Sequence, residues 1–143
     1  MIVVDASVAA KWILAEPHSD RAEALYNATL EAGEPIVAPA LVLFEVTNIL
    51  RRRMVRFGLS LPTVQHLMTQ FLDLSLTLSG PAGLHQRALA LAEAHRLPAA
   101  YDAHYLALAE SLRCDLWTDD RRLIHSVGAS LPLVRDISTF HLP

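Results

Sequence analysis

The chain opens on the segment Met1-Ile2-Val3-Val4-Asp5-Ala6-Ser7, and this segment decides the fold class. Its residues 2–4 form a continuous apolar run of β-branched side chains, which is typical of a strand buried on both faces of a parallel sheet. Such a strand needs helices on both faces of its sheet to cover it. The opening segment therefore predicts an α/β fold.

Short apolar runs recur along the chain and alternate with longer segments of helical pattern. The predicted strands are residues 2–4, 35–38, 76–78, 115–118 and 132–134. The predicted helices are residues 7–14, 19–32, 40–57, 61–74, 81–96, 99–112 and 120–126. This alternation indicates a mainly parallel sheet, and in such sheets functional residues gather at the carboxyl ends of the strands.

Length and composition point to a single globular domain over residues 1–143. The 143 residues are 52% hydrophobic and 19% charged, which excludes a disordered chain. No apolar run approaches the roughly 20 residues of a membrane span, and the N-terminus has no features of a signal peptide. The single cysteine, Cys114, cannot form an internal disulfide, so we expect a cytoplasmic protein without membrane association.

Four acidic residues lie at the seams between apolar segments: Asp5, Glu45, Asp102 and Asp120. Carboxylates are rarely fully buried without a partner, and an isolated buried carboxylate is strongly penalised. Four of them in apolar surroundings suggest that something positive lies among them, and a divalent cation is the simplest answer. We therefore predict that the four side chains converge on one pocket at the carboxyl edge of the sheet.

Each of these acids also has an ordinary structural interpretation when it is taken alone. Asp5 could cap the helix that follows it. Asp102 could interact with the dipole of its helix as a residue of the first turn. Glu45 shares one helical stripe with Asn48 and Arg52, and that stripe could simply be solvated.

A cluster of carboxylate oxygens suits Mg²⁺ or Mn²⁺ better than Zn²⁺. The sequence has no C-x-x-C or H-E-x-x-H motif, and its seven histidines show no spacing typical of metal ligands. A cation of this kind can lower the pKa of a bound water and neutralise charge on a phosphodiester. The cluster therefore favours phosphodiester hydrolysis by a metal-activated water, without a covalent enzyme intermediate.

Four short motifs carry the acids in order along the chain. They are Ile2-Val3-Val4-Asp5-Ala6-Ser7, Phe44-Glu45-Val46-Thr47-Asn48-Ile49-Leu50-Arg51, Tyr101-Asp102-Ala103-His104-Tyr105-Leu106-Ala107-Leu108-Ala109 and Trp117-Thr118-Asp119-Asp120-Arg121-Arg122-Leu123. Together they resemble the motifs of PIN-domain ribonucleases, and more narrowly those of the VapC-type toxins of toxin–antitoxin pairs. The resemblance implies a three-layer α/β/α sandwich and Mg²⁺- or Mn²⁺-dependent endoribonuclease activity. It also implies a homodimer, an RNA substrate and a cognate antitoxin that blocks the site with a basic side chain.

The resemblance also assigns roles to individual residues. Asp5, Glu45 and Asp102 match the family's first three catalytic and metal-binding acids. The fourth motif usually reads Thr, any residue, Asp, which selects Asp120 and leaves Asp119 at the variable position. Because adjacent side chains diverge, we expect one of this pair to face the site while the other caps the short helix. The matched supporting residues are Ser7, Asn48 and Thr118.

An acidic pocket in a chain of net charge −3 needs local positive charge before RNA phosphates can approach. The predicted RNA-binding residues are Arg52, Arg121 and Arg122. The other arginines on the Arg52 helix point elsewhere around it and more simply form a solvated or partner-binding face; they are Arg51, Arg53 and Arg56.

Two other fold families that gather acids at strand ends fit less well. A receiver domain needs a lysine at a late strand, whereas the only lysine here is Lys11. A haloacid-dehalogenase phosphatase needs a second aspartate where this chain has Ser7. The alternative that stays open is a non-catalytic PIN-type module that binds RNA or protein.

Overall fold

The computed structural model describes residues 1–142, and the strands of this part of the chain form one five-stranded sheet. The strands are β1 (Ile2–Val4), β2 (Ile36–Ala38), β3 (Thr77–Leu78), β4 (Asp115–Thr118) and β5 (Val134–Asp136). They lie in the order β3-β2-β1-β4-β5, and every neighbouring pair is parallel. The predicted parallel sheet is confirmed, with the opening segment at its centre.

The last strand begins later than predicted. The sequence placed it at residues 132–134, whereas β5 begins at Val134. Val134 donates its backbone N–H to the Leu131 carbonyl at 3.0 Å, so the preceding residues form a turn. Pro132 within this turn has no N–H to donate to a neighbouring strand.

The helices follow the predicted segments, with changes at their ends. They are α1 (Ala6–Ala9), α2 (Ser19–Glu31), α3 (Leu41–Phe57), α4 (Leu61–Leu72), α5 (Leu84–Ala94), α6 (Tyr101–Leu112) and α7 (Arg121–Val127). The predicted helix 7–14 is instead α1 followed by a 3₁₀ turn, Ala10–Trp12. The start of α5 is delayed from residue 81 to Leu84 because Gly83 has a φ of 80°, which a right-handed helix excludes.

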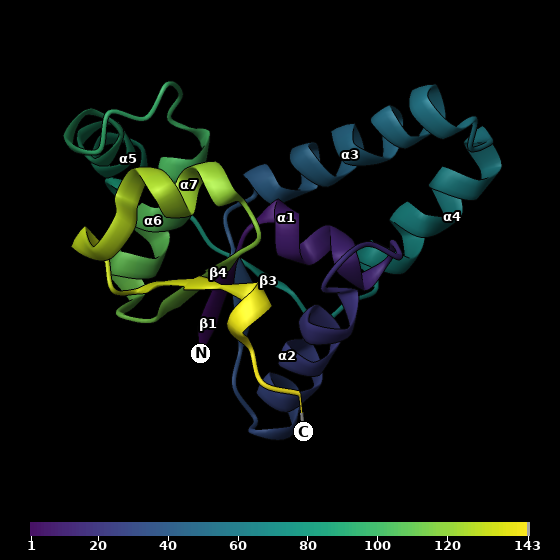
Figure 1. Cartoon of the computed structure of the whole chain (residues 1–143), viewed down its shortest axis with the longest axis horizontal. Coiled ribbons are helices and arrows are strands. Elements are labelled where there is room, and N and C mark those ends of the chain that lie inside the picture. Colours follow the sequence, from purple (N-terminus) through teal and green to yellow (C-terminus); the bar gives the residue numbers. More distant parts are fainter. Residues whose placement is uncertain (143) are drawn as a thin grey trace.

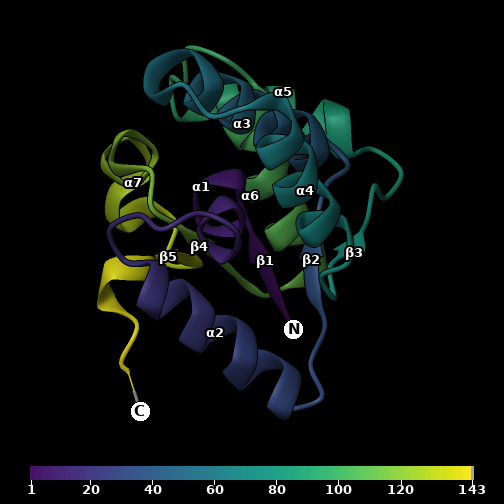
Figure 2. The ribbon, with the colours of Figure 1, turned by 90° about the vertical axis from the view of Figure 1, so that its right-hand side faces the viewer.

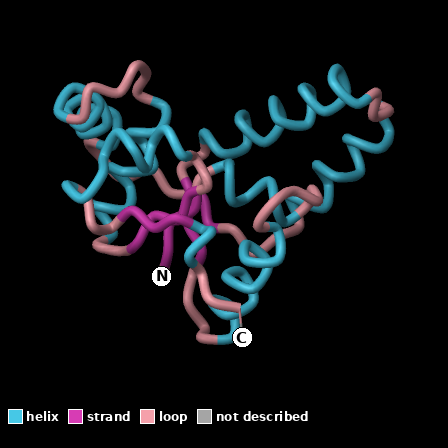
Figure 3. Tube along the Cα trace, viewed as in Figure 1, coloured by secondary structure: helices cyan, strands magenta, loops and turns pink. Residues whose placement is uncertain are grey.

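The helices form layers on both faces of the sheet. The chain runs outward from β1 to β2 and β3, then crosses to β4 and β5 on the other side of β1. Helices α1 and α2 contact the sheet from one face, and α6 and α7 contact it from the other, as right-handed crossovers between parallel strands lead one to expect. Figure 3 shows the strands enclosed between helices, and Figure 2 shows α2 and α6 on opposite sides of β1. The structure is the three-layer α/β/α sandwich expected from the resemblance.

The strand order creates a crevice between β1 and β4. The connection after β1 leads toward β2, and the connection after β4 leads the opposite way, toward β5. Ligands of open α/β sheets bind outside the carboxyl ends of the strands at such a switch point. Asp5 follows β1 there and donates its backbone N–H to the Trp117 carbonyl of β4 at 3.2 Å. The topology thus places acids from two distant motifs at one edge of the sheet.

Helices α3 and α4 form a hairpin that extends away from the sheet (Figure 1). Gly58 ends α3 in the left-handed conformation, at a φ of 69°. The Ser60 hydroxyl caps α4 by accepting the Thr63 N–H at 3.2 Å. Helix α3 packs against α1, so its first turns lie near the switch point while its arginine-rich end lies further out (Figure 1).

None of the helices within residues 1–142 combines the length and the apolar character that crossing a lipid bilayer requires.

Candidate active site

A pocket of about 210 Å³ lies at the switch point and contains all four predicted acids. Asp5 reaches it from the end of β1, Glu45 from α3, Asp102 from the first turn of α6, and Asp120 from the residue before α7. The structure therefore brings together the four carboxylates that the sequence selected. Their chemical role remains a prediction at this point.

Asp5 is the most buried of the four, with 5% of its surface exposed. Its Oδ1 accepts the Ser7 hydroxyl at 2.6 Å and the Val8 N–H at 3.1 Å, while its Oδ2 accepts the Thr118 hydroxyl. The bond from Val8 means that Asp5 does cap α1. A carboxylate offers about four lone-pair positions, so these three bonds leave acceptor capacity for the pocket.

Burial changes the acidity of Asp5. Desolvation, with a smaller contribution from the negative charge of Asp102, raises its pKa from 3.8 to about 6 against the lowering effect of its three hydrogen bonds. Repulsion among clustered carboxylates also raises their pKa values. The larger cause here is burial, and repulsion adds to it.

Glu45 is held by a tyrosine that the sequence analysis missed. The Tyr105 hydroxyl donates a hydrogen bond to the Glu45 Oε2 across the contact between α6 and α3. Burial raises the pKa of Glu45, the Tyr105 bond opposes that rise, and the Asp102 charge adds to it. Burial and the Glu45 charge also raise the pKa of Tyr105, which keeps its hydroxyl a donor. Tyr105 follows Asp102 by three residues, and that helical spacing could have indicated it.

The charge of Asp120 affects the acidity of Asp102 across the pocket. Burial raises the pKa of Asp102, the nearby charge of Asp120 raises it further, and Arg122 opposes both. Asp120 also caps α7, because its Oδ1 accepts the backbone N–H groups of Arg122 at 2.8 Å and Leu123 at 3.3 Å.

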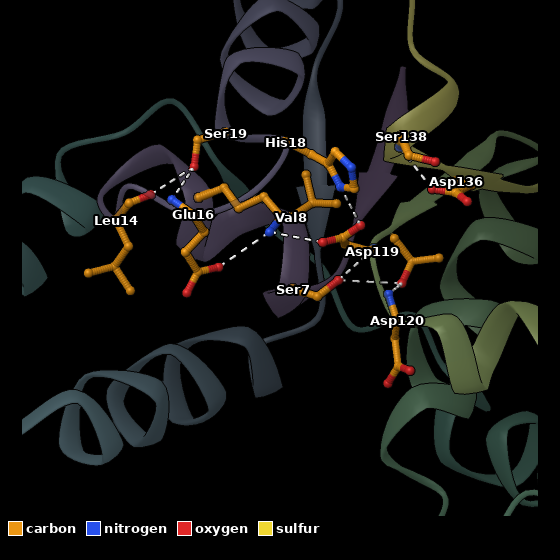
Figure 4. Close-up of polar contacts among 12 residues, drawn as sticks. Ser7, Val8, Leu14, Glu16, His18, Ser19, Asp119, Asp120, Asp136 and Ser138 are labelled. Atoms are coloured by element: carbon orange, nitrogen blue, oxygen red, sulfur yellow. Dashed lines mark hydrogen bonds and ion pairs between the residues drawn. The ribbon is translucent and has the colours of Figure 1, made fainter. Parts of the chain in front are cut away.

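Asp119 lies outside the pocket. Its carboxylate contacts Lys11 Nζ at 2.9 Å and His18 Nδ1 at 3.0 Å. Figure 4 shows Asp119 turned toward His18 while Asp120 points away from it. The expectation that one of the two faces the site while the other caps the helix is therefore wrong, since Asp120 does both. Asp119 instead neutralises the buried ammonium group of Lys11.

Ser7 and Thr118 join the turns that carry Asp5 and Asp120. The Ser7 hydroxyl accepts the backbone N–H of Asp119 at 2.7 Å and donates to Asp5. The Thr118 hydroxyl accepts the backbone N–H of Asp120 at 2.9 Å and also donates to Asp5. Each hydroxyl thereby fixes a carboxylate and the neighbouring backbone at once. Asn48, the third predicted supporting residue, is exposed and lines the pocket.

The predicted RNA-binding arginines are placed differently from one another. Arg52 is exposed and lines the pocket, and Arg122 is close enough to Asp102 to lower its pKa. Arg121 instead pairs with Asp136 at 3.2 Å and does not line the pocket.

The donors of the pocket suit a hard cation. The pocket is lined by carboxylates, the Ser7 hydroxyl, and the Asn48 amide, and no histidine or cysteine lines it. Oxygen donors of this kind favour Mg²⁺ or Mn²⁺ over Zn²⁺. Within residues 1–142 there is no group of three or more His, Cys, Asp or Glu side chains arranged closely enough to hold a metal ion by themselves. Mg²⁺ in proteins commonly binds one or two carboxylates and keeps several waters.

Comparison with known proteins connects this pocket to a family. Residues 2–128 match the family model described as PIN domain. The chain is 34% identical over 133 residues to VapC ribonuclease Mb0985 of Mycobacterium bovis and to ribonuclease VapC9 of Mycobacterium tuberculosis. Each match covers 93% of this chain and 96% of the relative. The fold is similar to that of PAE2754 from Pyrobaculum aerophilum, with a TM-score of 0.70 at 23% identity over 96% of this chain and 91% of that one.

Proposed function

The chain belongs to the PIN-domain family and to its VapC ribonucleases, and from this premise we propose that its switch-point pocket is the catalytic site. Its activity is that of an endoribonuclease of the toxin type, a hydrolase of RNA phosphodiester bonds. The observation that carries the site assignment is the convergence of Asp5, Glu45, Asp102 and Asp120 on one pocket of about 210 Å³.

Carboxylates of this pocket, together with water molecules, would hold the divalent metal ion on which this family generally depends, here Mg²⁺ or Mn²⁺. Such an ion supplies an activated water and neutralises charge on the phosphodiester. The chain's own residues set the positions of the acids. Ser7 and Thr118 orient Asp5, and Tyr105 orients Glu45, each through a hydroxyl that donates to the carboxylate.

Two arginines would bring the RNA backbone to this negative pocket. Arg52 lies on the pocket wall formed by α3, and Arg122, which does not itself line the pocket, is close enough to Asp102 to lower its pKa. A phosphate between them gains attraction from both guanidinium groups, which bind phosphate oxygens in a planar fork. Arg121 is left out of this proposal because its guanidinium group is already paired with Asp136.

The partners follow from the family. A VapC ribonuclease acts on RNA and is controlled by an antitoxin, and we propose both for this chain, together with a homodimer and a cytoplasmic site of action. We also propose that residues 1–143 act as one domain. The family match ends at residue 128, and β5 continues the same sheet beyond it.

An RNA-cleavage assay tests the proposal. Purified protein should cleave RNA only when Mg²⁺ or Mn²⁺ is present, and a chelator should stop the reaction. Asp102→Asn should abolish cleavage, whereas Asp73→Asn, at an exposed position on the C-terminal cap of α4, should not. Cleavage that persists in the chelator would contradict the metal dependence, and RNA binding without cleavage would favour the non-catalytic module. Sequencing the 5′ ends of RNA from expressing cells would identify the substrate.

A further inference from the structure

A second pocket, of about 440 Å³, lies beside the carboxylate pocket. It opens where β2 and β3 end and is closed by residues of α3, α5 and α6. We call it the side pocket and define it by its main lining residues, which are Leu41, Leu78, Ser79, His85, Tyr101 and His104. Its volume falls within the range of pockets that bind small molecules.

The two pockets share the walls formed by α3 and α6. Tyr101 of the side pocket directly precedes Asp102 of the carboxylate pocket, and His104 directly precedes Tyr105. On α3, Leu41 comes one helical turn before Glu45, which corresponds to a rise of about 6 Å. An extended strand whose phosphate lies among the carboxylates would therefore pass the opening of the side pocket with the next nucleotide.

The lining combines an aromatic face with a fixed imidazole pair. Tyr101 has 63% of its surface exposed, although it is a large ring at the start of a helix. His104 Nδ1 lies 2.6 Å from the Ala100 carbonyl and therefore carries a proton, and its Nε2 lies 2.9 Å from His85 Nδ1. His104 then accepts from His85 in the neutral pair, which leaves the outer nitrogen of His85 as an acceptor.

We infer that the side pocket binds the unpaired base of the nucleotide next to the cleaved phosphate, with the base stacked on Tyr101 and its edge toward His85. This inference rests on the proposed ribonuclease function and names a specificity subsite for it. Single-stranded RNA is recognised by bases stacked on aromatic side chains and hydrogen-bonded at their edges. No lysine or arginine lines the side pocket, so a base fits it better than a second phosphate does.

The test combines changes in the protein with changes in the RNA. A short single-stranded RNA with a cleavage site mapped for the wild-type protein is prepared intact and with one abasic nucleotide at each position flanking that site. KM and kcat are then measured with Mn²⁺ for the wild type, Tyr101→Ala, Tyr101→Phe and Leu89→Ala. Leu89 is the matched control, because it is 65% exposed on α5 and lines neither pocket.

Tyr101→Ala should raise KM for intact RNA by roughly tenfold, the lower part of the effect of removing one stacked base. Tyr101→Phe, which keeps the ring face, should stay near the wild type, and Leu89→Ala should match it. One abasic position should cost the wild type a similar factor and cost Tyr101→Ala nothing more, because both changes remove the same contact.

Three results would overturn the inference. The first is equal KM values for Tyr101→Ala and Leu89→Ala. The second is an abasic loss that adds in full to the Tyr101→Ala loss at every position. The third is a change of molecular mass in solution on Tyr101→Ala, which would show that a second copy of the chain covers the side pocket. A wild-type protein that cleaves no RNA with Mn²⁺ would instead refute the proposed function, and the subsite with it.

Discussion

Two residues of this site have a structural role in addition to the catalytic role proposed for them. Asp5 and Asp120 each cap a helix through backbone N–H groups, and each also lines the carboxylate pocket. The capping interpretation is thus correct for these residues, and it is compatible with the catalytic role proposed for them. Because the caps fix the carboxylates in the apo protein, their orientation does not depend on a bound ion.

The raised pKa of Asp5 predicts a pH-dependent stability. A carboxyl group whose folded-state pKa lies above its unfolded value binds its proton more tightly when folded, so the free energy of unfolding falls as pH rises. The window runs from about 4 to about 6, because burial raises the pKa of Asp5 from 3.8 to about 6. A shift of about two units corresponds to roughly 3 kcal/mol.

Asp5→Asn removes this charge and should remove the contribution of Asp5 to the fall in stability, while the raised pKa values of Glu45 and Asp102 keep theirs. Urea unfolding of metal-free protein should give an advantage of the variant over the wild type that is near zero at pH 4 and approaches roughly 3 kcal/mol at pH 7. The control is Asp73→Asn, which should follow the wild-type curve. Parallel curves for Asp5→Asn and the wild type would show that Asp5 does not titrate in this window.

The same substitution to asparagine should lower kcat at Asp120 and lower the free energy of unfolding at Asp119. Asp120→Asn removes a pocket carboxylate and should lower kcat on the order of a hundredfold or more, with a small change in stability. Asp119→Asn leaves the buried Lys11 with only Glu16 as a partner and should lower the free energy of unfolding by about 2 kcal/mol. Cleavage kinetics and urea unfolding measure the two effects. A larger loss of kcat for Asp119→Asn than for Asp120→Asn would show that Asp119, and not Asp120, is the fourth acid of the site.

Among the secondary-structure elements, α3 is the one proposed to connect the pocket to the approaching RNA. Glu45 and Arg52 lie on one stripe of this helix, and both line the carboxylate pocket. Arg53 points about 100° away, where it pairs with Glu16 and lies over the Phe57 ring. The direction of each arginine around α3 therefore distinguishes Arg52, the proposed contact for substrate, from Arg53, which makes a structural contact.

This separation can be measured with two alanine substitutions. Arg52→Ala should weaken binding of single-stranded RNA at low salt and reduce the slope of log K against log salt by about 0.7, the share of one phosphate contact. Arg53→Ala should leave that slope unchanged and lower stability through the lost Glu16 pair. Fluorescence anisotropy over a salt series gives the slopes. Equal slopes for both variants would mean that a diffuse basic patch guides the RNA.

The elements also show which parts of the structure a sequence can predict. Apolar runs and glycine stops are local signals, so β1, β2, β4 and α3 lie within one residue of the predicted ranges. Contacts between distant residues carry no local signal. The Tyr105–Glu45 bond joins residues 60 apart, and the Thr118–Asp5 bond joins residues 113 apart. The acids of the pocket, together with Ser7 and Thr118, could be selected from the sequence, whereas the Tyr105 hydroxyl and the contacts that hold the acids required the fold.

At the scale of the whole molecule, the strand order explains why four weak motifs make one site. The order β3-β2-β1-β4-β5 places the first and last motifs on adjacent strands, although they lie at opposite ends of the chain. The α3 and α6 helices then bring the second and third motifs from the two faces of the sheet. The site therefore exists only in the folded chain, and a ligand of the site must stabilise the fold as a whole.

Mn²⁺ should accordingly raise the melting temperature of the protein. An ion that binds only the native state at a hundredfold excess over its Kd stabilises it by about 2.7 kcal/mol, which corresponds to roughly 5–10 °C for a chain of this size.

Asp102→Asn should abolish most of this shift in melting temperature. It should also melt no lower than the wild type without metal, because the Asp120 charge raises the pKa of Asp102 and its repulsion is then relieved. Asp73→Asn should keep the full shift. Thermal unfolding of the wild type and the two variants, with chelator or with millimolar Mn²⁺, measures these melting temperatures and their shifts. An equal shift in Asp102→Asn and the wild type would place the ion outside the carboxylate pocket.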